Sequence, residues 1–276
     1  MFRRASVLAA IVVLVLTFSG CGPSLVVTSE EEYPLNAMVS VIDLNGYNGG
    51  IRWYPIEPGE QPRITITKEV RGSDEQAMQQ FLDEILLEDD STEFEVVLRA
   101  VQPKLMKGVN GSAVRFDVYA PPERITHFFA YTHNGLIEVK ADFRGYLGLN
   151  TSNGRIVLWS GQGEVDAKTS NGAIELGRVV LTGSSTFTTS NGRIEGVVIL
   201  PPTGRFIFET SNGYIRLRMP SDTSGTFYLY TSNGRINYYL DSEGITQENY
   251  LCVTRGAQPV VDIRTSNGSI EIVPDR

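Results

Sequence analysis

The chain has 276 residues, of which 24 are Lys or Arg and 32 are Asp or Glu, so its formal net charge is −8. This acidic balance excludes a nucleic-acid binder that holds phosphates on a basic face. Two His and two Cys exclude multi-His metal centres, Cys₄ zinc sites and disulfide frameworks, and we expect no cofactor. The unusual count is 27 Gly, and most glycines of the second half fall at regular positions.

Residues 1–20 have the pattern of a secretory signal peptide. A positively charged start is followed by an apolar stretch over 5–18 and by small residues before Cys21. The apolar run is shorter than the roughly 20 residues that span a bilayer. Phe18–Cys21 resembles the bacterial lipobox, although Leu is usual where Phe18 stands. The resemblance implies that Cys21 is the lipidated first residue (a palmitate-bearing lipoprotein), with ordinary secretion and an uncleaved anchor as alternatives.

The region before residue 126 lacks the repeat described below, apart from one isolated copy. We expect 21–36 to be the lipidated N-terminus and a polar tether, and 37–125 to be a β/α capping region. Ser73–Gln76 has the form of a capping box, and the apolar residues that follow at helical spacing predict one helix near 74–88. Strands are predicted at 63–70, 93–101 and 114–119. This region would cover the open N-terminal end of the repeats.

A hexapeptide, Thr-Ser-Asn-Gly-x-Ile, recurs through residues 126–276 and is the strongest signal in the sequence. The first copy is a variant, and Asn48 begins an isolated, similar string. The asparagines of the seven copies are Asn134, Asn153, Asn171, Asn191, Asn212, Asn233 and Asn267. Apolar and polar residues alternate on both sides of each Asn-Gly, which predicts half-buried strands. The longer gap before the last copy holds an insertion at about 241–259.

Two architectures fit this pattern. Asn-Gly between alternating strands is typical of a hairpin, because both residues tolerate positive φ, and this favours an antiparallel meander or barrel. A parallel β-solenoid places each residue on its counterpart one coil away, and this explains why the copies are nearly identical. We therefore favour a mainly β fold, a parallel solenoid or β-helix of about seven coils of 18–21 residues with an N-terminal α+β cap.

The lipobox, the segment Phe116–Pro121 and the stacked hexapeptides together resemble the DUF4097 family of adhesin-like bacterial proteins. The resemblance covers roughly 37–276. It implies a β-solenoid on the cell envelope with an adhesin-like or structural role, and it implies no catalytic residue.

Stacked copies would align their outward side chains in columns. One column places Glu175 and Glu195 one coil apart, at the carboxylate separation of a retaining glycosidase. The alternative is a solvated face on which Arg216 neutralises Glu195, and we favour it. A second column holds Arg155, Arg193, Tyr214 and Arg235, a possible ligand face for an anionic glycan or a phosphate-bearing polymer, although solubility explains the same residues.

The remaining candidate residues carry little chemistry. Cys252 lies in an apolar run, so we expect a buried, inert thiol. His127 and His133 flank an aromatic stretch and are expected to be structural, and no metal site is predicted.

We predict a non-catalytic lipoprotein of the bacterial cell envelope with an adhesin-like, scaffolding or binding role. The expected place is the cell membrane or outer membrane, on the extracytoplasmic side, with the lipid anchor in the membrane. A glycan or an envelope protein is the expected partner. The alternatives are a carbohydrate-active β-helix enzyme and an envelope-stress signalling accessory.

Overall fold

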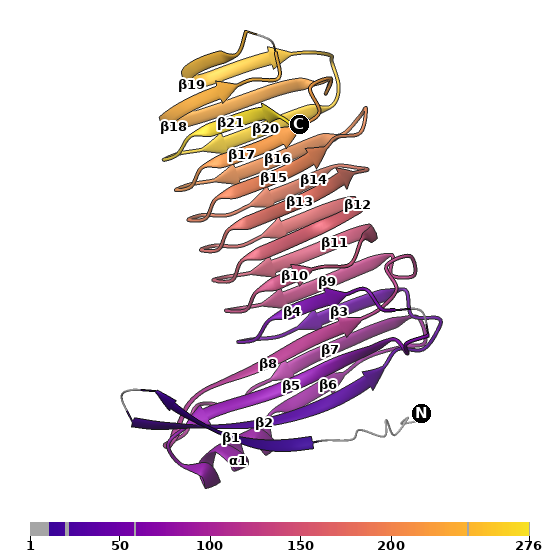
Figure 1. The fold of residues 1–276 in the computed structure, drawn as a ribbon, viewed down its shortest axis with the longest axis vertical. Helices are drawn as coiled ribbons and strands as arrows, with labels where there is room; N and C mark the ends of the chain where they lie inside the picture. Colours follow the sequence, from indigo (N-terminus) through magenta and orange to yellow (C-terminus); the bar gives the residue numbers. More distant parts are fainter. Residues whose placement is uncertain (1–10, 20–21, 58, 242, 276) are drawn as a thin grey trace.

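A computed structural model of the chain describes residues 11–19, 22–57, 59–241 and 243–275. Among these residues the fold is mainly β, with one α-helix (Figure 1). The strands are stacked along the long axis of the molecule, with β1 and α1 at one end and β18 and β19 at the other.

The elements follow the chain in two parts. The N-terminal part contains β1 (Ile11–Ser19), β2 (Gly22–Pro34), β3 (Val41–Asn45), β4 (Ile51–Tyr54), β5 (Arg63–Gly72), α1 (Glu75–Glu84), β6 (Leu86–Asp89), β7 (Glu95–Val101) and β8 (Val109–Tyr119). The repeat part contains β9 (His127–Thr132), β10 (Ile137–Val139), β11 (Phe143–Thr151), β12 (Ile156–Lys168), β13 (Ile174–Leu181), β14 (Ser185–Thr188), β15 (Ile194–Ile199), β16 (Arg205–Thr210), β17 (Ile215–Met219), β18 (Thr226–Tyr238), β19 (Ile245–Thr254), β20 (Val260–Thr265) and β21 (Ile270–Pro274).

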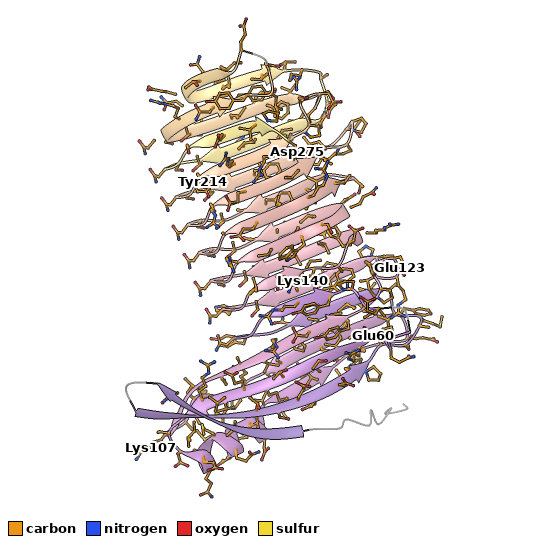
Figure 2. All side chains as sticks on the ribbon, viewed as in Figure 1. Glu60, Lys107, Glu123, Lys140, Tyr214 and Asp275 are labelled. Carbon is orange, nitrogen blue, oxygen red and sulfur yellow. The ribbon has the colours of Figure 1, made fainter. Side chains whose placement is uncertain are left out.

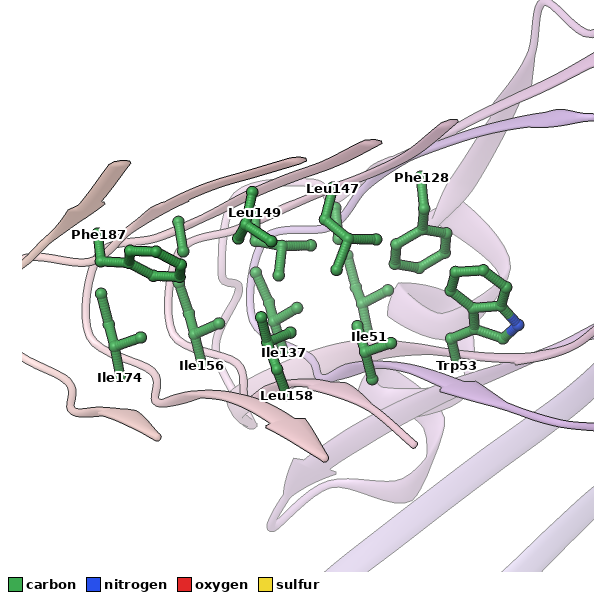
Figure 3. Close-up of a cluster of buried hydrophobic side chains, with 14 of the residues drawn as sticks. Ile51, Trp53, Phe128, Ile137, Leu147, Leu149, Ile156, Leu158, Ile174 and Phe187 are labelled. Carbon is green, nitrogen blue, oxygen red and sulfur yellow. The ribbon is translucent and has the colours of Figure 1, made fainter. Parts of the chain in front are cut away.

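Strands from different copies of the hexapeptide pair in parallel and in register. The Ile that follows each Asn-Gly lies beside its counterpart in the neighbouring copy, and all of these side chains are buried: Ile51, Ile137, Ile156, Ile174, Ile194, Ile215, Ile270 and Ile236. Figure 3 shows Ile51, Ile156 and Ile174 on the opposite side of the core from Leu147, Phe128 and Phe187. The alternating pattern therefore supplies a single apolar core enclosed by the sheet.

The antiparallel meander is wrong for the repeats, because every pairing between copies is parallel. In the described chain, antiparallel pairs join only β1–β2, β2–β5, β5–β8, β6–β7 and β18–β19, near the two ends. The parallel sheet closes around the core because β12 and β18 each run through both of its sides, and further strands lie outside it. The arrangement is not a simple series of seven coils in chain order.

The last two copies of the hexapeptide stack in the opposite order to their order in the sequence. β20 pairs with β16 on one side and with β18 on the other, and β21 lies in the same way between β17 and β18. The copy of Asn267 is thus inserted between those of Asn212 and Asn233. The insertion at 241–259 explains this order, since β19 within it pairs antiparallel with β18 and forms the end of the stack.

The N-terminal part continues the parallel pairing beyond the expected boundary at 125/126. β3 and β4 carry the isolated copy at Asn48 and pair with β9 and β10, and with β7 and β8 on their other side. The segment expected to be a tether, 21–36, forms β2 over Gly22–Pro34, which pairs with β5. The alternating Val27 and Ser29 are buried there, so β2 contributes to the cap.

Helix α1 confirms the predicted helix, but its N-cap is Asp74 and not Ser73, the first residue of the predicted capping box. The Asp74 side chain accepts a hydrogen bond from the Ala77 N–H at 3.1 Å, as an N-cap residue does. The helix ends at Glu84, four residues before the expected end, because Ile85 has extended backbone and β6 follows at once. Met78 and Phe81 are buried under the cap.

The Asn-Gly corners do not use positive φ, in contrast to the hairpin turns that this dipeptide normally forms. Neither the asparagines nor the glycines of the repeat corners are among the positive-φ residues of the described chain. Glycine is required by close approach instead. A Cβ atom on Gly192 would lie well under 3.0 Å from the Gly172 carbonyl oxygen of the next copy, and the other corner glycines are confined in the same way.

We predict that Gly192→Ala destabilises the protein by more than about 3 kcal/mol, because the new methyl group must separate two stacked backbones. The matched control is Gly111→Ala in β8, where a Cβ meets no atom within 4 Å. Urea unfolding followed by circular dichroism measures both free energies. Equal, small losses of stability in the two variants would contradict the close-packed corner.

Candidate functional site

The corner asparagines form one continuous ladder of side-chain hydrogen bonds. Each Nδ2 donates to the Oδ1 of the neighbouring copy at 2.6–2.8 Å from Asn153 onward, in the order Asn134, Asn153, Asn171, Asn191, Asn212, Asn267 and Asn233. Asn134 donates to Asn48 in the same way. Each amide thus satisfies the next one, so the ladder is a structural element whose amides already have partners.

The threonine of each copy lies beneath this ladder and faces the interior, as the alternation predicts. The Thr169 hydroxyl, for example, donates to the Gly154 carbonyl at 2.9 Å, and the Gly172 N–H donates back to the Thr169 oxygen at 3.2 Å. The same bond to a neighbouring glycine carbonyl recurs at Thr151, Thr189, Thr210, Thr265 and Thr231. These hydroxyls are therefore unavailable to a ligand.

The first predicted surface column is present in register. Glu138, Val157, Glu175, Glu195, Arg216, Glu271 and Asn237 lie side by side on successive strands, with the last two exchanged as the strand order requires. Glu175 and Glu195 are direct neighbours. The sequence therefore placed these two carboxylates together correctly.

Arg193 joins the two carboxylates. Its Nη2 lies 2.7 Å from a Glu175 oxygen and its Nε lies 2.5 Å from a Glu195 oxygen. The Tyr214 hydroxyl donates to the second Glu195 oxygen at 2.8 Å, and Arg155 Nη1 lies 3.5 Å from Glu175. The expected partner of Glu195, Arg216, instead binds Glu271 at 3.1 Å. Negative charges one layer apart are thus compensated by cations of the adjoining column.

The electrostatics of Glu195 do not suit a general acid. Burial acts to raise its pKa, but hydrogen bonds from Arg193 and Tyr214 and the positive charges of Arg193 and Arg216 bring the pKa below its ordinary value. A glycosidase acid needs the opposite shift, so that it keeps its proton near neutral pH. The pair resembles a surface ion-pair network more than a catalytic dyad.

The predicted ligand face is only partly assembled. Arg155, Arg193 and Tyr214 meet around Glu175 and Glu195, as described above. Arg235 lies apart from them, because the exchanged copy puts Ser269 beside Tyr214, and Arg235 lies opposite Glu248 of β19. Arg155 and Arg193 are already paired with carboxylates, which weakens this face as a site for an anionic polymer.

The structure describes one of the two cysteines. Cys21 lies outside the described residues. Cys252 is an exposed free cysteine, so the expectation of a buried thiol is wrong. The alternation in β19 turns Leu251 and Val253 inward and Cys252 outward.

The two histidines are held by neighbouring side chains. The His133 ring stacks on Tyr47 at 5.2 Å between centroids, and His127 Nδ1 lies 3.0 Å from the Thr126 hydroxyl. Across the described residues, no group of three or more His, Cys, Asp or Glu side chains is arranged to hold a metal ion.

Sequence reasoning missed a cluster of exposed tyrosines at the C-terminal end. Tyr228 and Tyr230 of β18 and Tyr250 of β19 line a shallow depression of about 500 Å³ together with Asp262 and Arg264. The sequence could have predicted that Tyr228 and Tyr230 lie on one face, since residues two apart on a strand share a face. The position of Tyr250 beside them could not be predicted, because β19 lies outside the repeat.

Comparison with known proteins adds little to this geometry. No family model matches the chain, and no curated protein matches it. In the described part of the chain, no helix is both long enough and apolar enough to cross a membrane.

Several solved structures of bacterial proteins match over most of their length. A provisionally named cell adhesion protein from Clostridium sporogenes has 13% identity and a TM-score of 0.27, with 90% of this chain and 100% of that chain covered. A provisionally named adhesin from Bacteroides fragilis has 9% identity and a TM-score of 0.46, covering 89% and 97%. A provisionally named lipid-binding protein from Parabacteroides distasonis has 11% identity and a TM-score of 0.36, covering 90% and 97%. Likenesses of this size carry no functional argument.

We predict that Glu195 titrates below its ordinary pKa of 4.5 and that Arg193→Ser raises this value, because burial then acts with less opposition. Carboxyl-carbon NMR of the labelled protein between pH 2 and 8 measures both midpoints. Arg178→Ser is the control, since Arg178 pairs with Asp275 and not with Glu195. A Glu195 midpoint above the ordinary value in the unmodified protein would contradict the ion-pair interpretation and favour an acid catalyst.

Proposed function

We propose that the chain is a lipid-anchored protein of the bacterial cell envelope with a non-catalytic binding or scaffolding role. Its mature part is a rigid β-solenoid closed by a cap at each end. The observation that carries this proposal is the unbroken corner ladder, which uses the same polar residues of every copy for stacking. A catalytic coil would break the pattern at one level, and each copy of the hexapeptide keeps its Asn, Gly and buried Ile.

The surface charges support the same conclusion. The carboxylates with catalytic spacing are bound by Arg193, and a depression at the C-terminal end, with Arg216, Arg218, Tyr239 and Asp241 on its walls, is open to solvent. Nothing in the described part of the chain favours the carbohydrate-active enzyme or the signalling accessory over a binding role.

The placement of the two ends supports an anchored scaffold. β2 begins at Gly22, next to the predicted lipid attachment site, and belongs to the end that also holds α1, while β18 and β19 form the opposite end (Figure 1). Figure 2 shows the same separation, with Lys107 near α1 and Asp275 near the C-terminal end. An anchor at Cys21 would hold the first end at a membrane and present the second end away from it.

We expect the full chain, produced in a bacterium that processes lipoproteins, to incorporate labelled palmitate and to sediment with membranes. Cys21→Ala removes the only proposed acceptor and abolishes the label, whereas Cys252→Ala leaves the label unchanged. Mass spectrometry of the N-terminus accompanies the labelling.

Two results would contradict the lipid anchor. An unlabelled, soluble chain indicates ordinary secretion. An unlabelled, membrane-bound chain that retains residues 1–20 indicates an uncleaved anchor.

A further inference from the structure

The C-terminal cap presents three exposed tyrosine rings on one face, which we name the tyrosine platform: Tyr228, Tyr230 and Tyr250. Their exposed fractions are 39%, 47% and 55%. Tyr230 lies directly opposite Tyr250 in the antiparallel pair of β18 and β19, and Tyr228 lies opposite Cys252. The Cβ atoms of cross-strand neighbours on one face lie about 4.5–5.5 Å apart, and the three side chains line one shared depression.

Charged groups border the platform and neutralise one another. Asp262 lies beside Tyr228 and Arg264 beside Tyr230 on the next strand, β20. Asp262 is buried and lies 2.7 Å from Arg205 Nη2 and 3.4 Å from Arg264 Nη2. Glu209 lies next to Arg264 in the register, so two cations face two carboxylates. The border therefore offers hydrogen-bonding groups without an excess of either charge.

The two columns that end in Tyr228 and Tyr230 carry aromatic side chains only at the ends of the repeat stack, since the first copy has Phe129 and Tyr131 there and the copies between have none. In the central copies the same two columns hold Asp166, Thr186 and Ile207, and Lys168, Thr188 and Glu209. The stacking of the repeats does not require tyrosine at these positions. Three large rings left in contact with water at one end are therefore better explained by an external partner.

We propose that the tyrosine platform binds an uncharged polysaccharide chain. Flat aromatic rings match the C–H faces of pyranose sugars, and the tyrosine hydroxyls and the exposed part of the Arg264 guanidinium supply donors and acceptors for sugar hydroxyl groups, while buried Asp262 holds Arg264 in place. Charge balance at the border disfavours a uronic or phosphorylated polymer, which would require unpaired cations. The face thus differs from the Arg155–Arg193 column in place and in ligand chemistry.

This inference rests on the proposed binding role and not on the lipid anchor. The platform belongs to the end opposite β2, so a protein held at Cys21 would present it toward polymers outside the membrane (Figure 1). The open, shallow shape of the depression suits one side of an extended chain better than an enclosed small molecule.

The test uses the full chain in detergent and isothermal titration with neutral cellohexaose, laminarihexaose and maltohexaose, and with acidic hexagalacturonate. At least one neutral oligosaccharide is expected to bind, and Tyr250→Ala and Tyr230→Ala should each weaken its binding by about tenfold. Tyr239→Ala is the matched control, since Tyr239 is 42% exposed outside the platform, and it should change affinity less than twofold. Exposed tyrosines contribute little to folding, and thermal unfolding verifies that each variant is intact.

Each alternative result overturns the platform in a distinct way. If neutral oligosaccharides bind equally well to both platform variants, the tyrosine platform is not the binding site, while the proposed binding role is retained. Binding of hexagalacturonate alone shows that charge, and not ring stacking, selects the ligand. Tyr250-dependent sedimentation with phosphatidylcholine vesicles assigns the rings to a membrane, and a Tyr250-dependent dimer assigns them to a second copy. Absence of binding to any of these probes overturns the platform and also removes its support for the binding role.

Discussion

The spacing between parallel strands, about 4.8 Å, is the constraint on which the rest of the structure depends. An asparagine amide spans that distance with one hydrogen bond, and a glycine is the only residue that fits where two corner backbones meet. The buried threonine then closes the corner through the glycine carbonyl of the next copy. These three requirements explain why one hexapeptide recurs with so little change, while the residues between the corners vary.

The same spacing governs the surface. Outward positions of neighbouring copies form columns, so like charges at one position come within a single layer of each other. Arg193 between Glu175 and Glu195 relieves this repulsion, and a similar role falls to Arg216 beside Glu271. These ion pairs therefore reduce the electrostatic repulsion that stacking creates between carboxylates of neighbouring copies. The C-terminal end differs, since Tyr250 lies on β19, which pairs only with β18 among the described strands.

The sequence predicts what is periodic, and it fails where the periodicity is ambiguous or ends. The fixed offsets of Thr, Asn and Ile were sufficient to predict parallel stacking, the inward threonines and the adjacent pair Glu175 and Glu195. The stacking order of the copies at Asn233 and Asn267 could not be predicted, because nearly identical hexapeptides fit beside one another in either order. The observed order goes with the pairing of β19 with β18, which lies outside the repeat. The exposure of Cys252 could not be predicted either, because Cys252 lies on β19 and no repeat shows which face of that strand is buried.

Disulfide trapping at the corners, in a Cys252→Ser background, tests the stacking order most directly. Ser211 and Ser266 are exposed, and the Ser266 N–H donates to the Ser211 carbonyl at 3.2 Å, so Ser211→Cys with Ser266→Cys should cross-link on mild oxidation. Ser232 lies one layer further, roughly 10 Å from Ser211, beyond the reach of a disulfide. The account predicts that Ser211→Cys with Ser232→Cys stays reduced. Cross-linking of the 211–232 pair and not of the 211–266 pair would show that the copies stack in chain order and would contradict it.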